Sequence, residues 1–513
     1  MIDAAAHDEL VKNLAATLKL QSGKPAHVYR THISSVVTCG AYAYKLKRPV
    51  KLPFVDFSTL TLRRQDCRRE LRVNQRTAPD LYLGVVKLTG SPERPRIGGT
   101  GKSLEWAVKM KRFDQAALLS NLIKHNSISV RMAESLGHHL ASFSNALRGL
   151  KPHQIQAHRA TLDWLLESLT EITAIVPAEH KSAAQIQSWA KQQARKHHRR
   201  INKRKEHGFY RNCHGDLHLA NLVKLGTKVI AFDALEFNRE LSQIDVVNDI
   251  AFAFMDLLAH SRADLAWSMV NQWCEHTGDY GGLPLLRFYS LYRAVVRAKV
   301  AALAHNAARA GGLHTFERYW LLASKLVAPA NPPRLVLVAG LSGSGKSTVA
   351  RELVAALSGI QVRADVVRKR LFSNHIHEPN KLYSHRATQK TYLELASIAN
   401  TLLSSNMTVI VDATFLDNEH LRLFAQVANK HKIPLKAIVC EAPIDILKQR
   451  IRERAKQGID PSDATATILE QQIERLHKTP MAWPVPPHRL DTSGSRALGK
   501  RRIRRLANML LGQ

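Results

Sequence analysis

The stretch Arg334 to Ala350 reads RLVLVAGLSGSGKSTVA. An apolar run leads into Gly340, and the residues from Gly340 to Ser347 then complete the pattern G-x-x-x-x-G-K-S. This order is typical of a strand, a phosphate-binding loop and a helix. Because glycines let the backbone turn its N–H groups toward phosphate oxygens, the stretch predicts a P-loop in a domain with a parallel sheet.

The side chains of this loop have distinct expected roles around a bound nucleotide. Lys346 is expected to reach the β- and γ-phosphates of ATP, and Ser347 is expected to ligate Mg²⁺. ATP and Mg²⁺ are therefore the expected cofactors. The predicted nucleotide contacts in this loop are Gly340, Ser342, Gly343, Ser344, Gly345, Lys346, Ser347 and Thr348.

Further polar residues follow predicted strands of the same domain. Asp365 comes after a short second strand, and Asp412 comes after a wholly apolar one. Since ligands gather at the carboxyl ends of parallel strands, we expect Asp412 to hold Mg²⁺ and Asp365 to meet an acceptor hydroxyl. Arg450 and Arg454 share one face of a predicted helix. They are expected either to close over the phosphates or to form a solvated basic face.

The bulk composition limits the classes of protein to consider. At 513 residues, with 45% hydrophobic and 23% charged residues, the chain is expected to form two or more globular domains. A net charge of +33 favours anionic partners such as nucleotides or nucleic acid. The five scattered cysteines indicate neither a disulfide framework nor a zinc site. With no signal-peptide pattern and no long apolar run, we expect a cytoplasmic protein without a membrane partner.

A proline-rich segment, VAPANPPR at 327–334, marks the clearest predicted boundary. Strand-like alternation dominates the sequence up to about residue 112, and helical periodicity dominates from there to the prolines. The expected fold is α/β and α+β, in two domains. The predicted divisions are a first domain at 1–328 with a small lobe at about 1–112 and a large lobe at about 113–328, a linker at 329–333, and a second domain at 334–513.

One stretch of the predicted large lobe, CHGDLHLANLVKLGTKVIAFDALEFN at 213–238, is rich in polar groups. Gly226 and Thr227 predict a two-residue hairpin turn. If this register holds, Asn221 and Asp233 lie at the same end of the hairpin, where they would hold a metal. Asp216 lies just upstream and is expected to accept the proton of an acceptor hydroxyl. This division of labour is that of kinase-type phosphoryl transfer.

HGDLHLAN with the following FDALEFN resembles the aminoglycoside phosphotransferase family, whose kinase-like members carry an HGD-x-H-x-x-N loop. The resemblance implies a bilobal, protein-kinase-like domain. It also implies that Asp216 is the catalytic base and that Asn221 and Asp233 are Mg²⁺ ligands.

The same resemblance implies a lysine that positions ATP from a small-lobe strand, for which AYAYKLK at 41–47 is the candidate. Strand alternation puts Lys45 and Lys47 on one face and leaves both open, whereas the resemblance favours Lys45. The acidic partner of this lysine is expected on the next helix. Glu70 is the expected partner, with Asp66 as the rival.

The second domain has a resemblance of its own. GLSGSGKST, RADVVRKRLF, VDATF, the two arginines and DPSDAT at 460–465 are similar to small P-loop kinases related to polynucleotide kinase, gluconate kinase and zeta-type toxins. The joined arrangement resembles bacterial proteins that combine an aminoglycoside-phosphotransferase-like domain with an AAA-type, ATP-binding P-loop domain. This resemblance implies transfer of the γ-phosphoryl group of ATP to a hydroxyl and identifies no acceptor.

Two basic stretches, 193–209 and 499–507, are expected to be solvated helix faces, with contact to a nucleic-acid backbone as the alternative. The acids Glu236, Asp245, Asp249 and Asp256 are expected to stabilise the fold. The predicted function is a bifunctional ATP-dependent phosphotransferase whose acceptors are unidentified. The alternatives are a C-terminal 5′-hydroxyl nucleic-acid kinase and a catalytically silent N-terminal ligand sensor that regulates the P-loop domain.

Overall fold

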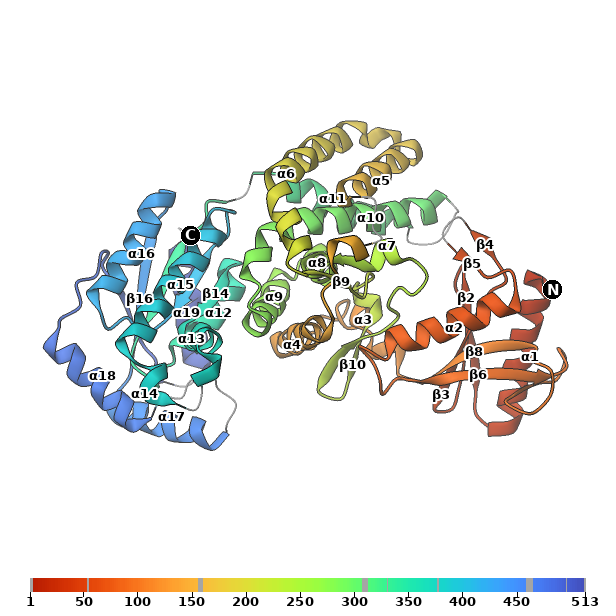
Figure 1. Cartoon of the computed structure of the whole chain (residues 1–513), viewed down its shortest axis with the longest axis horizontal. Coiled ribbons are helices and arrows are strands. Elements are labelled where there is room, and N and C mark those ends of the chain that lie inside the picture. The colour runs from red at the N-terminus through yellow and green to blue at the C-terminus, as the bar shows by residue number, and fades with distance from the viewer. Residues whose placement is uncertain are drawn as a thin grey trace. The chain divides into compact units, whose positions relative to one another are not determined.

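A computed structural model of the chain describes residues 3–52, 55–155, 160–306, 312–329, 331–375, 378–457, 465–494 and 496–511 (Figure 1). The chain divides into two compact units. The first unit comprises Met1–Asp256 and Phe288–Leu321, and the second comprises Leu257–Arg287 and Leu322–Gln513. The second unit thus takes in a segment that precedes the proline-rich stretch. The limits predicted from the sequence, with the first domain ending at residue 328 and the second beginning at residue 334, stay a prediction.

Strands dominate the first part of the chain, with one helix ahead of them and one among them. In order they are α1 (Ala4–Ser22), β1 (Ala26–Arg30), β2 (Ser34–Cys39), β3 (Tyr42–Lys47), β4 (Lys51–Leu52), β5 (Val55–Asp56), α2 (Leu60–Asn74), β6 (Tyr82–Gly90), β7 (Pro95–Ile97) and β8 (Glu105–Lys111). Helices then dominate, as predicted. They and their short strands are α3 (Leu119–Leu122), α4 (Val130–Ala146), α5 (Thr161–Ile175), α6 (His180–Glu206), β9 (Tyr210–Asn212), β10 (Leu222–Leu225), β11 (Lys228–Ala231), α7 (Arg239–Ser242), β12 (Gln243–Asp245), α8 (Val246–Ala259), α9 (Ala263–Thr277), α10 (Leu286–Asn306) and α11 (Gly312–Val327).

The remaining elements alternate between strand and helix again. They are β13 (Leu335–Ala339), α12 (Lys346–Leu357), β14 (Ile360–Arg363), α13 (Ala364–Leu371), α14 (Pro379–Leu382), α15 (His385–Leu403), β15 (Val409–Asp412), α16 (Asn418–His431), β16 (Leu435–Glu441), α17 (Ile444–Gln457), α18 (Ala466–Lys478), β17 (His488–Asp491) and α19 (Arg496–Leu511). The fold is mixed α/β, as predicted.

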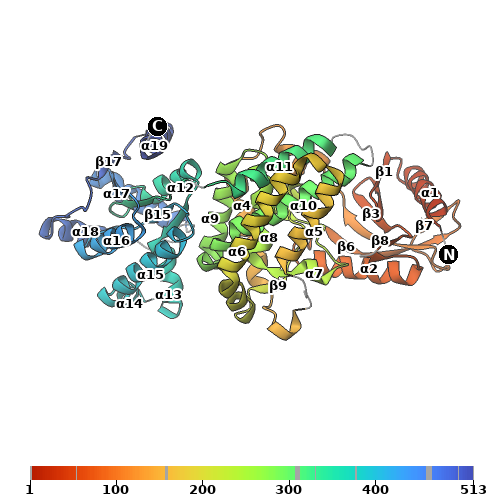
Figure 2. The same ribbon diagram turned by 90° about the horizontal axis from the view of Figure 1, so that it is seen from above.

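The first unit begins with an antiparallel sheet in the order β1-β2-β3-β8-β6-β7. Side chains alternate across this sheet, and Figure 2 shows it between α1 and α2. Tyr44 and Leu46 belong to the core with Leu14 of α1, whereas Ala43 belongs to the core with Cys67 of α2. The odd-numbered residues of β3 therefore face α2, and this face includes both candidate lysines.

The helical part of the first unit contains the predicted hairpin. Leu225 lies opposite Lys228 and Leu222 lies opposite Ala231. The Phe232 N–H donates to the Asn221 carbonyl at 3.0 Å, which extends the same register by one position. The predicted register is therefore confirmed, and it carries Asn221 and Asp233 to one end of the hairpin.

The second unit is built on a parallel sheet in the order β14-β15-β13-β16-β17. One face packs against α12 and α19, with Val338, Leu353 and Leu506 in a common core. The partly buried Trp267 of α9 packs against the same core. This confirms the predicted parallel sheet. No helix within the described residues is long and apolar enough to cross a membrane.

Candidate functional site

The loop before the hairpin is held by backbone hydrogen bonds to a buried acid. The N–H groups of His214 and Gly215 donate to the two oxygens of Asp249 at 3.0 and 2.8 Å. Gly215 has a φ of +84°, and a Cβ there would lie 2.9 Å from the carbonyl oxygen of Leu241. Only glycine fits this position without strain. The backbone that leads into Asp216 is therefore held in one conformation.

Asp216 has two side-chain partners from its own loop. The Nδ2 of Asn221 donates to Asp216 Oδ2 at 2.9 Å, and the Nε2 of His218 lies 3.3 Å from the same oxygen. Burial raises the pKa of Asp216, but the charges of His218 and Arg297 outweigh it and bring that pKa below its usual range. The carboxylate is thus kept ionised, as a proton acceptor must be. His218 also packs edge-on against Phe252, so it braces the loop.

Lys45 joins the sheet to the hairpin. Its Nζ lies 2.9 Å from Glu70 Oε1 on α2 and 2.5 Å from Asp233 Oδ1 after β11. Asp233 has a φ of +61°, and its N–H donates to the hydroxyl of Tyr82 at 3.1 Å. The structure thus brings together Lys45, Glu70 and Asp233, which lie far apart in the sequence.

Lys47 is enclosed by carboxylates on the same face. Its Nζ lies 2.8 Å from Asp66, 2.6 Å from Glu70 and 2.5 Å from Glu236, and its side chain is 1% exposed. Burial is the main cause that raises the pKa of Glu236 to about 7, although Lys47 opposes it. Glu70 therefore contacts both lysines, and the rival acid Asp66 contacts only Lys47 of the two. Lys45, at 12% exposed, is the more accessible lysine.

The remaining acids stabilise the fold, as expected. Asp256 accepts from the Leu219 N–H at 2.8 Å and from the Tyr319 hydroxyl at 2.7 Å. Asp245 pairs with Arg204 at 2.6 Å inside the helical part of the unit. The bonds of Asp256 link the loop that carries Asp216 to α8 and α11, and the Asp245–Arg204 pair joins β12 to α6.

The P-loop lies between β13 and α12. Gly340, Gly343 and Gly345 have φ angles of +144°, +83° and +79°, which favour glycine. A Cβ on Gly343 would lie 2.7 Å from the carbonyl oxygen of Leu447. The hydroxyl of Thr492 donates to the Ser344 carbonyl at 2.8 Å and fixes the loop from β17. The glycines that predicted this loop are therefore required by its conformation.

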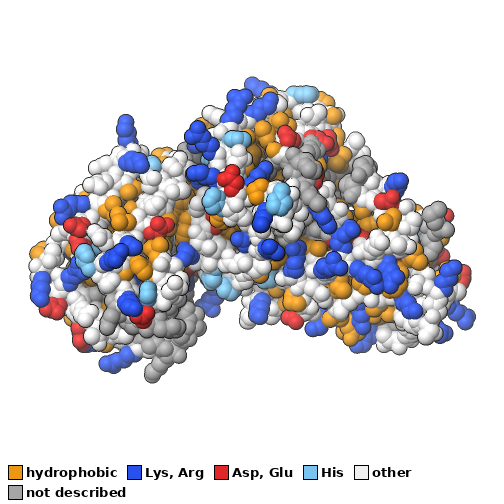
Figure 3. Space-filling model, viewed as in Figure 1, with side chains coloured by type: hydrophobic (Ala, Val, Ile, Leu, Met, Phe, Trp, Pro, Cys, Tyr) orange, Lys and Arg blue, Asp and Glu red, His pale blue; other side chains and the backbone are white. Residues whose placement is uncertain are grey.

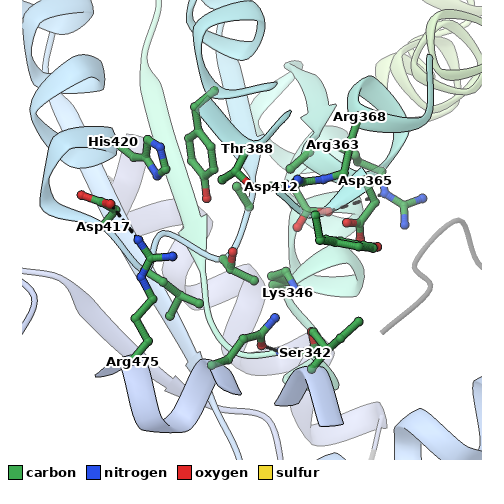
Figure 4. A pocket seen from close by; sticks show the side chains of 18 of the residues that line it. Ser342, Lys346, Arg363, Asp365, Arg368, Thr388, Asp412, Asp417, His420 and Arg475 are labelled. Carbon is green, nitrogen blue, oxygen red and sulfur yellow. Dashed lines mark hydrogen bonds and ion pairs between the residues drawn. The ribbon is translucent and has the colours of Figure 1, made fainter. Parts of the chain in front are cut away.

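A pocket of about 180 Å³ opens beside the P-loop (Figure 4). Lys346, Asp365 and Asp412 line this pocket, so the structure brings together three of the predicted site residues. Ser347, in the first turn of α12, is among the groups that lower the pKa of Asp412. The other lining residues include Ser342, Arg363, Arg368, Thr388, Asp417, His420, Gln472 and Arg475.

Asp412 has the surroundings of a cation ligand. Its Oδ2 accepts from Gln361 Nε2 at 3.0 Å, and Arg363 Nε lies 3.6 Å away. Its Oδ1 is buried and has no hydrogen-bond partner within the described residues. Burial raises the pKa of this carboxylate, while Lys346 and Arg363 partly offset the rise. A buried oxygen left without a partner is costly, and a bound Mg²⁺ would relieve that cost.

Magnesium needs few protein side chains when it is bound together with a nucleotide. In the described ranges, no group of three or more His, Cys, Asp or Glu side chains is arranged to hold a metal ion. Mg²⁺ usually keeps waters and binds through one or two carboxylates plus substrate phosphates. The donor sets Ser347 with Asp412, and Asn221 with Asp233, fit that mode.

The two predicted lid arginines differ in position. Arg450 Nη1 donates to the Gly343 carbonyl at 3.3 Å, and its Nη2 donates to the Thr492 carbonyl at 2.6 Å. Arg454 lies one turn further along α17, is half-buried, and is not among the described residues that line the pocket. Residues 460–464, most of the DPSDAT motif, lie outside the described residues.

Several pocket residues were missing from the predicted site. Arg475 Nη2 donates to Asp417 Oδ2 at 2.9 Å, and His420 stacks on Tyr392 at 3.5 Å between ring centroids. Arg368 is 6% exposed and donates to Thr388 Oγ1 at 3.0 Å. The stretch RADVVRKRLF, quoted for its resemblance to small P-loop kinases, contains Arg363 and Arg368, but no role was predicted for them. Nothing local in the sequence distinguishes Arg475 or His420 from ordinary helix residues.

Helix α9 belongs to the second unit although it precedes the proline-rich segment in the sequence. Asn271 covers the edge strand β14, since its Oδ1 accepts from the Gln361 N–H at 2.6 Å and its Nδ2 donates to the Gly359 carbonyl at 2.9 Å. Glu275 pairs with Arg363 at 2.6 Å. This helix thus holds the two residues, Gln361 and Arg363, that surround Asp412.

The two basic stretches lie on helices. On α19, Ile503 and Leu506 are buried while Arg501 and Arg504 are exposed, which is the predicted solvated basic face. The stretch 193–209 lies largely on α6, where one face lines a cavity. Figure 3 shows more Lys and Arg than Asp and Glu side chains on the visible surface, in keeping with the net charge of +33.

Known proteins resemble this chain over different lengths. An uncharacterised protein of Mycobacterium tuberculosis is 29% identical over 492 residues, which covers 91% of this chain and 93% of the relative. A gluconokinase from Sinorhizobium meliloti 1021 is 19% identical, with 36% of this chain and 97% of that chain covered and a TM-score of 0.28. A choline/ethanolamine kinase family protein from Mesorhizobium loti is 10% identical, with 62% and 95% covered and a TM-score of 0.38. Because these TM-scores are low, the fold of each unit rests on its own strand order and register.

A family model described as an AAA domain matches residues 335–479. The match begins at the first residue of β13 and runs through the P-loop, Asp365, Asp412 and Arg450. It confirms the P-loop part of the resemblance seen in the sequence. The C-terminal part of the chain therefore contains an AAA-type P-loop domain.

Proposed function

We propose that the chain is an ATP-dependent phosphotransferase with two sites, each of which transfers the γ-phosphoryl group of ATP to a hydroxyl of an unidentified acceptor. The observation that carries this proposal is that each unit sets a lysine beside an acid at the end of a strand: Lys45 beside Asp233, and Lys346 in one pocket with Asp412. Such groups hold and neutralise phosphates in kinases.

In the first site, the ionised Asp216 accepts the proton of the acceptor hydroxyl. The hydroxyl oxygen then bonds to the γ-phosphorus as the bond from that phosphorus to ADP breaks. Lys45 orients the phosphates, with Glu70 fixing its position at 2.9 Å. Asn221 and Asp233 would hold Mg²⁺, which when bound neutralises phosphate charge.

In the second site, the backbone N–H groups of the P-loop and Lys346 hold the phosphates of ATP. Asp365 accepts the acceptor proton, and Ser347 and Asp412 would hold Mg²⁺. Arg450, already bonded to Gly343 and Thr492, adds positive charge beside the loop. Arg454 is assigned a secondary role in closing this site.

The test compares ADP release by the full chain and by three variants: Lys346→Ala, Asp216→Asn, and both together. Each single variant is expected to lose one part of the turnover, and the double variant is expected to lose all of it. Lys430→Ala, which removes an exposed lysine from the end of α16, serves as the control. If Asp216→Asn leaves turnover unchanged, the two-site proposal fails and the first unit is better described as a ligand sensor.

A second candidate is a 5′-hydroxyl nucleic-acid kinase in the second unit. The exposed arginines of α19 favour this candidate because they suit a phosphate backbone. Labelled phosphate should then appear on the 5′ end of a single-stranded oligonucleotide, and oligonucleotide binding should weaken steeply with salt. Absence of both results would leave a small-molecule acceptor.

A further inference from the structure

The first unit contains a cavity of about 730 Å³ among α5, α6, α8 and α10. This volume lies within the range of small-molecule sites, roughly 300–1,000 Å³. One face of α6 forms a wall, because its lining residues recur every three or four positions. They are Lys191, Arg195, His198, Asn202 and Lys205. The basic stretch on α6 therefore has a face that is turned toward a cavity.

Arg293 of α10 lines the cavity and is 3% exposed. Its Nε donates to Asn248 Oδ1 at 3.0 Å, its Nη1 donates to the Gly215 carbonyl at 3.2 Å, and its guanidinium lies over the ring of Phe252. These contacts fix its position. Its Nη2 is buried and has no hydrogen-bond partner among the described residues. A buried guanidinium nitrogen without an acceptor is costly, and an anion would satisfy it.

The charges around the cavity are unequal. The cavity lining contains four Lys or Arg side chains and two acids. The basic residues are Lys191, Arg195, Lys205 and Arg293, and the acids are Asp163 and Glu240. Asp163 already accepts a hydrogen bond from the Ala160 N–H at 2.9 Å. Lining of this kind favours a ligand with negative charge and disfavours a cationic one.

The cavity is linked directly to the loop that carries the proposed base. Arg293 bonds to the carbonyl of Gly215, the residue before Asp216. We propose that this cavity binds a small anion, with its phosphate or carboxylate group on Arg293 and the α6 cations, beside the loop that carries Asp216.

Titration calorimetry on the full chain tests the charge rule without relying on turnover. The probes are glycerol phosphate, glycerate, glycerol and aminopropanediol. All four have a three-carbon skeleton in which at least two carbons carry oxygen, and they differ in charge. The Lys346→Ala background weakens competing phosphate binding at the P-loop. The two anions are expected to bind saturably, and the neutral and cationic probes are not. The ratio of the two anion affinities shows whether the cavity prefers a phosphate or a carboxylate group.

Two neighbouring substitutions locate the binding. Arg195→Glu reverses a charge on the cavity wall and is expected to weaken anion binding by about tenfold or more. Lys196→Glu makes the same charge change at an exposed position of α6 that does not line the cavity, and it should leave binding unchanged. Both positions are on the surface of the helix, so folding is expected to survive. Arg293→Lys adds a variant that keeps the charge and loses the forked donor geometry.

The outcomes separate this inference from the proposed activity. Failure of both anions to bind, equal binding of the neutral probe, or binding insensitive to Arg195→Glu would overturn the inference. Charge-dependent binding that Arg195→Glu weakens, with turnover indifferent to Asp216→Asn, supports an anion-binding cavity and overturns the phosphotransferase assignment of this unit. Displacement of glycerol phosphate by a single-stranded oligonucleotide with the same Arg195→Glu sensitivity would overturn the small-anion assignment.

Discussion

The two candidate sites differ in how the fold positions the groups that would bind phosphate. The first site relies on side chains that are distant in sequence, with Lys45 bonded to Asp233 across 188 positions. The second site relies on consecutive residues whose backbone turns at Gly340, Gly343 and Gly345. The first site should therefore be sensitive to the loss of a charge, and the second to the loss of a backbone conformation.

The charges of the two sites differ as well. In the first site, two buried lysines face four carboxylates, and every one of these acids has a lysine partner: Asp66, Glu70, Asp233 and Glu236. In the second site, Asp412 keeps one buried oxygen without a partner within the described residues. The first site thus has two carboxylates in excess of its lysines but sets each acid in an ion pair, while the second site has a carboxylate oxygen without a hydrogen-bond partner.

The largest expected effect is loss of stability in Lys47→Met. Removing the lysine leaves Asp66, Glu70 and Glu236 buried around an apolar group, which should cost about 3–5 kcal/mol in the free energy of unfolding of the first unit. Urea denaturation of the full chain measures this change. Lys12→Met, at a position 73% exposed on α1, should have no comparable effect. Equal destabilisation by both variants would contradict a structural role for Lys47.

The next effect is catalytic and concerns the P-loop. Gly343→Ala places a Cβ 2.7 Å from the Leu447 carbonyl at a φ of +83°, so the loop must shift. The Asp216-independent part of ATP turnover should fall by about a hundredfold, as when a preorganised donor is removed. Gly494→Ala is the control, since a Cβ there meets nothing within 4 Å. A normal rate in Gly343→Ala would show that the backbone conformation is not required.

The third effect is a pH dependence of stability in the first unit. The pKa of Glu236 rises from 4.5 to about 7 on folding, so between these values the folded chain binds more protons than the unfolded chain. Its stability should therefore decrease as the pH rises through this window, by up to about 3 kcal/mol. Glu236→Gln removes the titrating group and should flatten this decrease in urea melts. An identical pH slope in both proteins would contradict the assignment.

The smallest effect is expected from α9. Glu275→Gln weakens the 2.6 Å pair with Arg363, which should then hold Asp412 more strongly and compete with Mg²⁺. The Mg²⁺ concentration needed for half-maximal turnover should rise about threefold. Glu419→Gln, an exposed acid of α16, gives the comparison. No shift, or an equal shift in both, would mean that α9 does not influence the second site.

Features that depend on residues close together in the sequence could be predicted from it. Glycine spacing located the P-loop, and the Gly226-Thr227 turn gave the hairpin register that carries Asn221 and Asp233 to one end. Alternation along β3 correctly put Lys45 and Lys47 on one face. It could not tell them apart, because the difference lies in which carboxylates of α2 and of the loop after β11 meet each lysine, and those contacts depend on tertiary packing.

Long-range contacts explain what the sequence did not reveal. The exposed side chains of α6 match the predicted solvated basic face, but the helical pattern alone does not show that a cavity lies beside Arg195. For the helix that carries Arg293, the sequence left open whether its polar side chains line an acceptor cleft or pack within the fold. The bonds of Asn271 to Gln361 and Gly359 join positions about 90 residues apart, and no local sequence motif predicts them.

These bonds by Asn271 have a practical consequence for dividing the molecule. A fragment that starts at the proline-rich segment would lack α9, although α9 packs within the same compact unit as β14. Its edge strand would expose the Gln361 N–H and the Gly359 carbonyl, which are open to pairing with other chains. Limited proteolysis at the prolines would thus not release the whole second unit, and a fragment that keeps α9 with the P-loop domain would begin at or before Leu257.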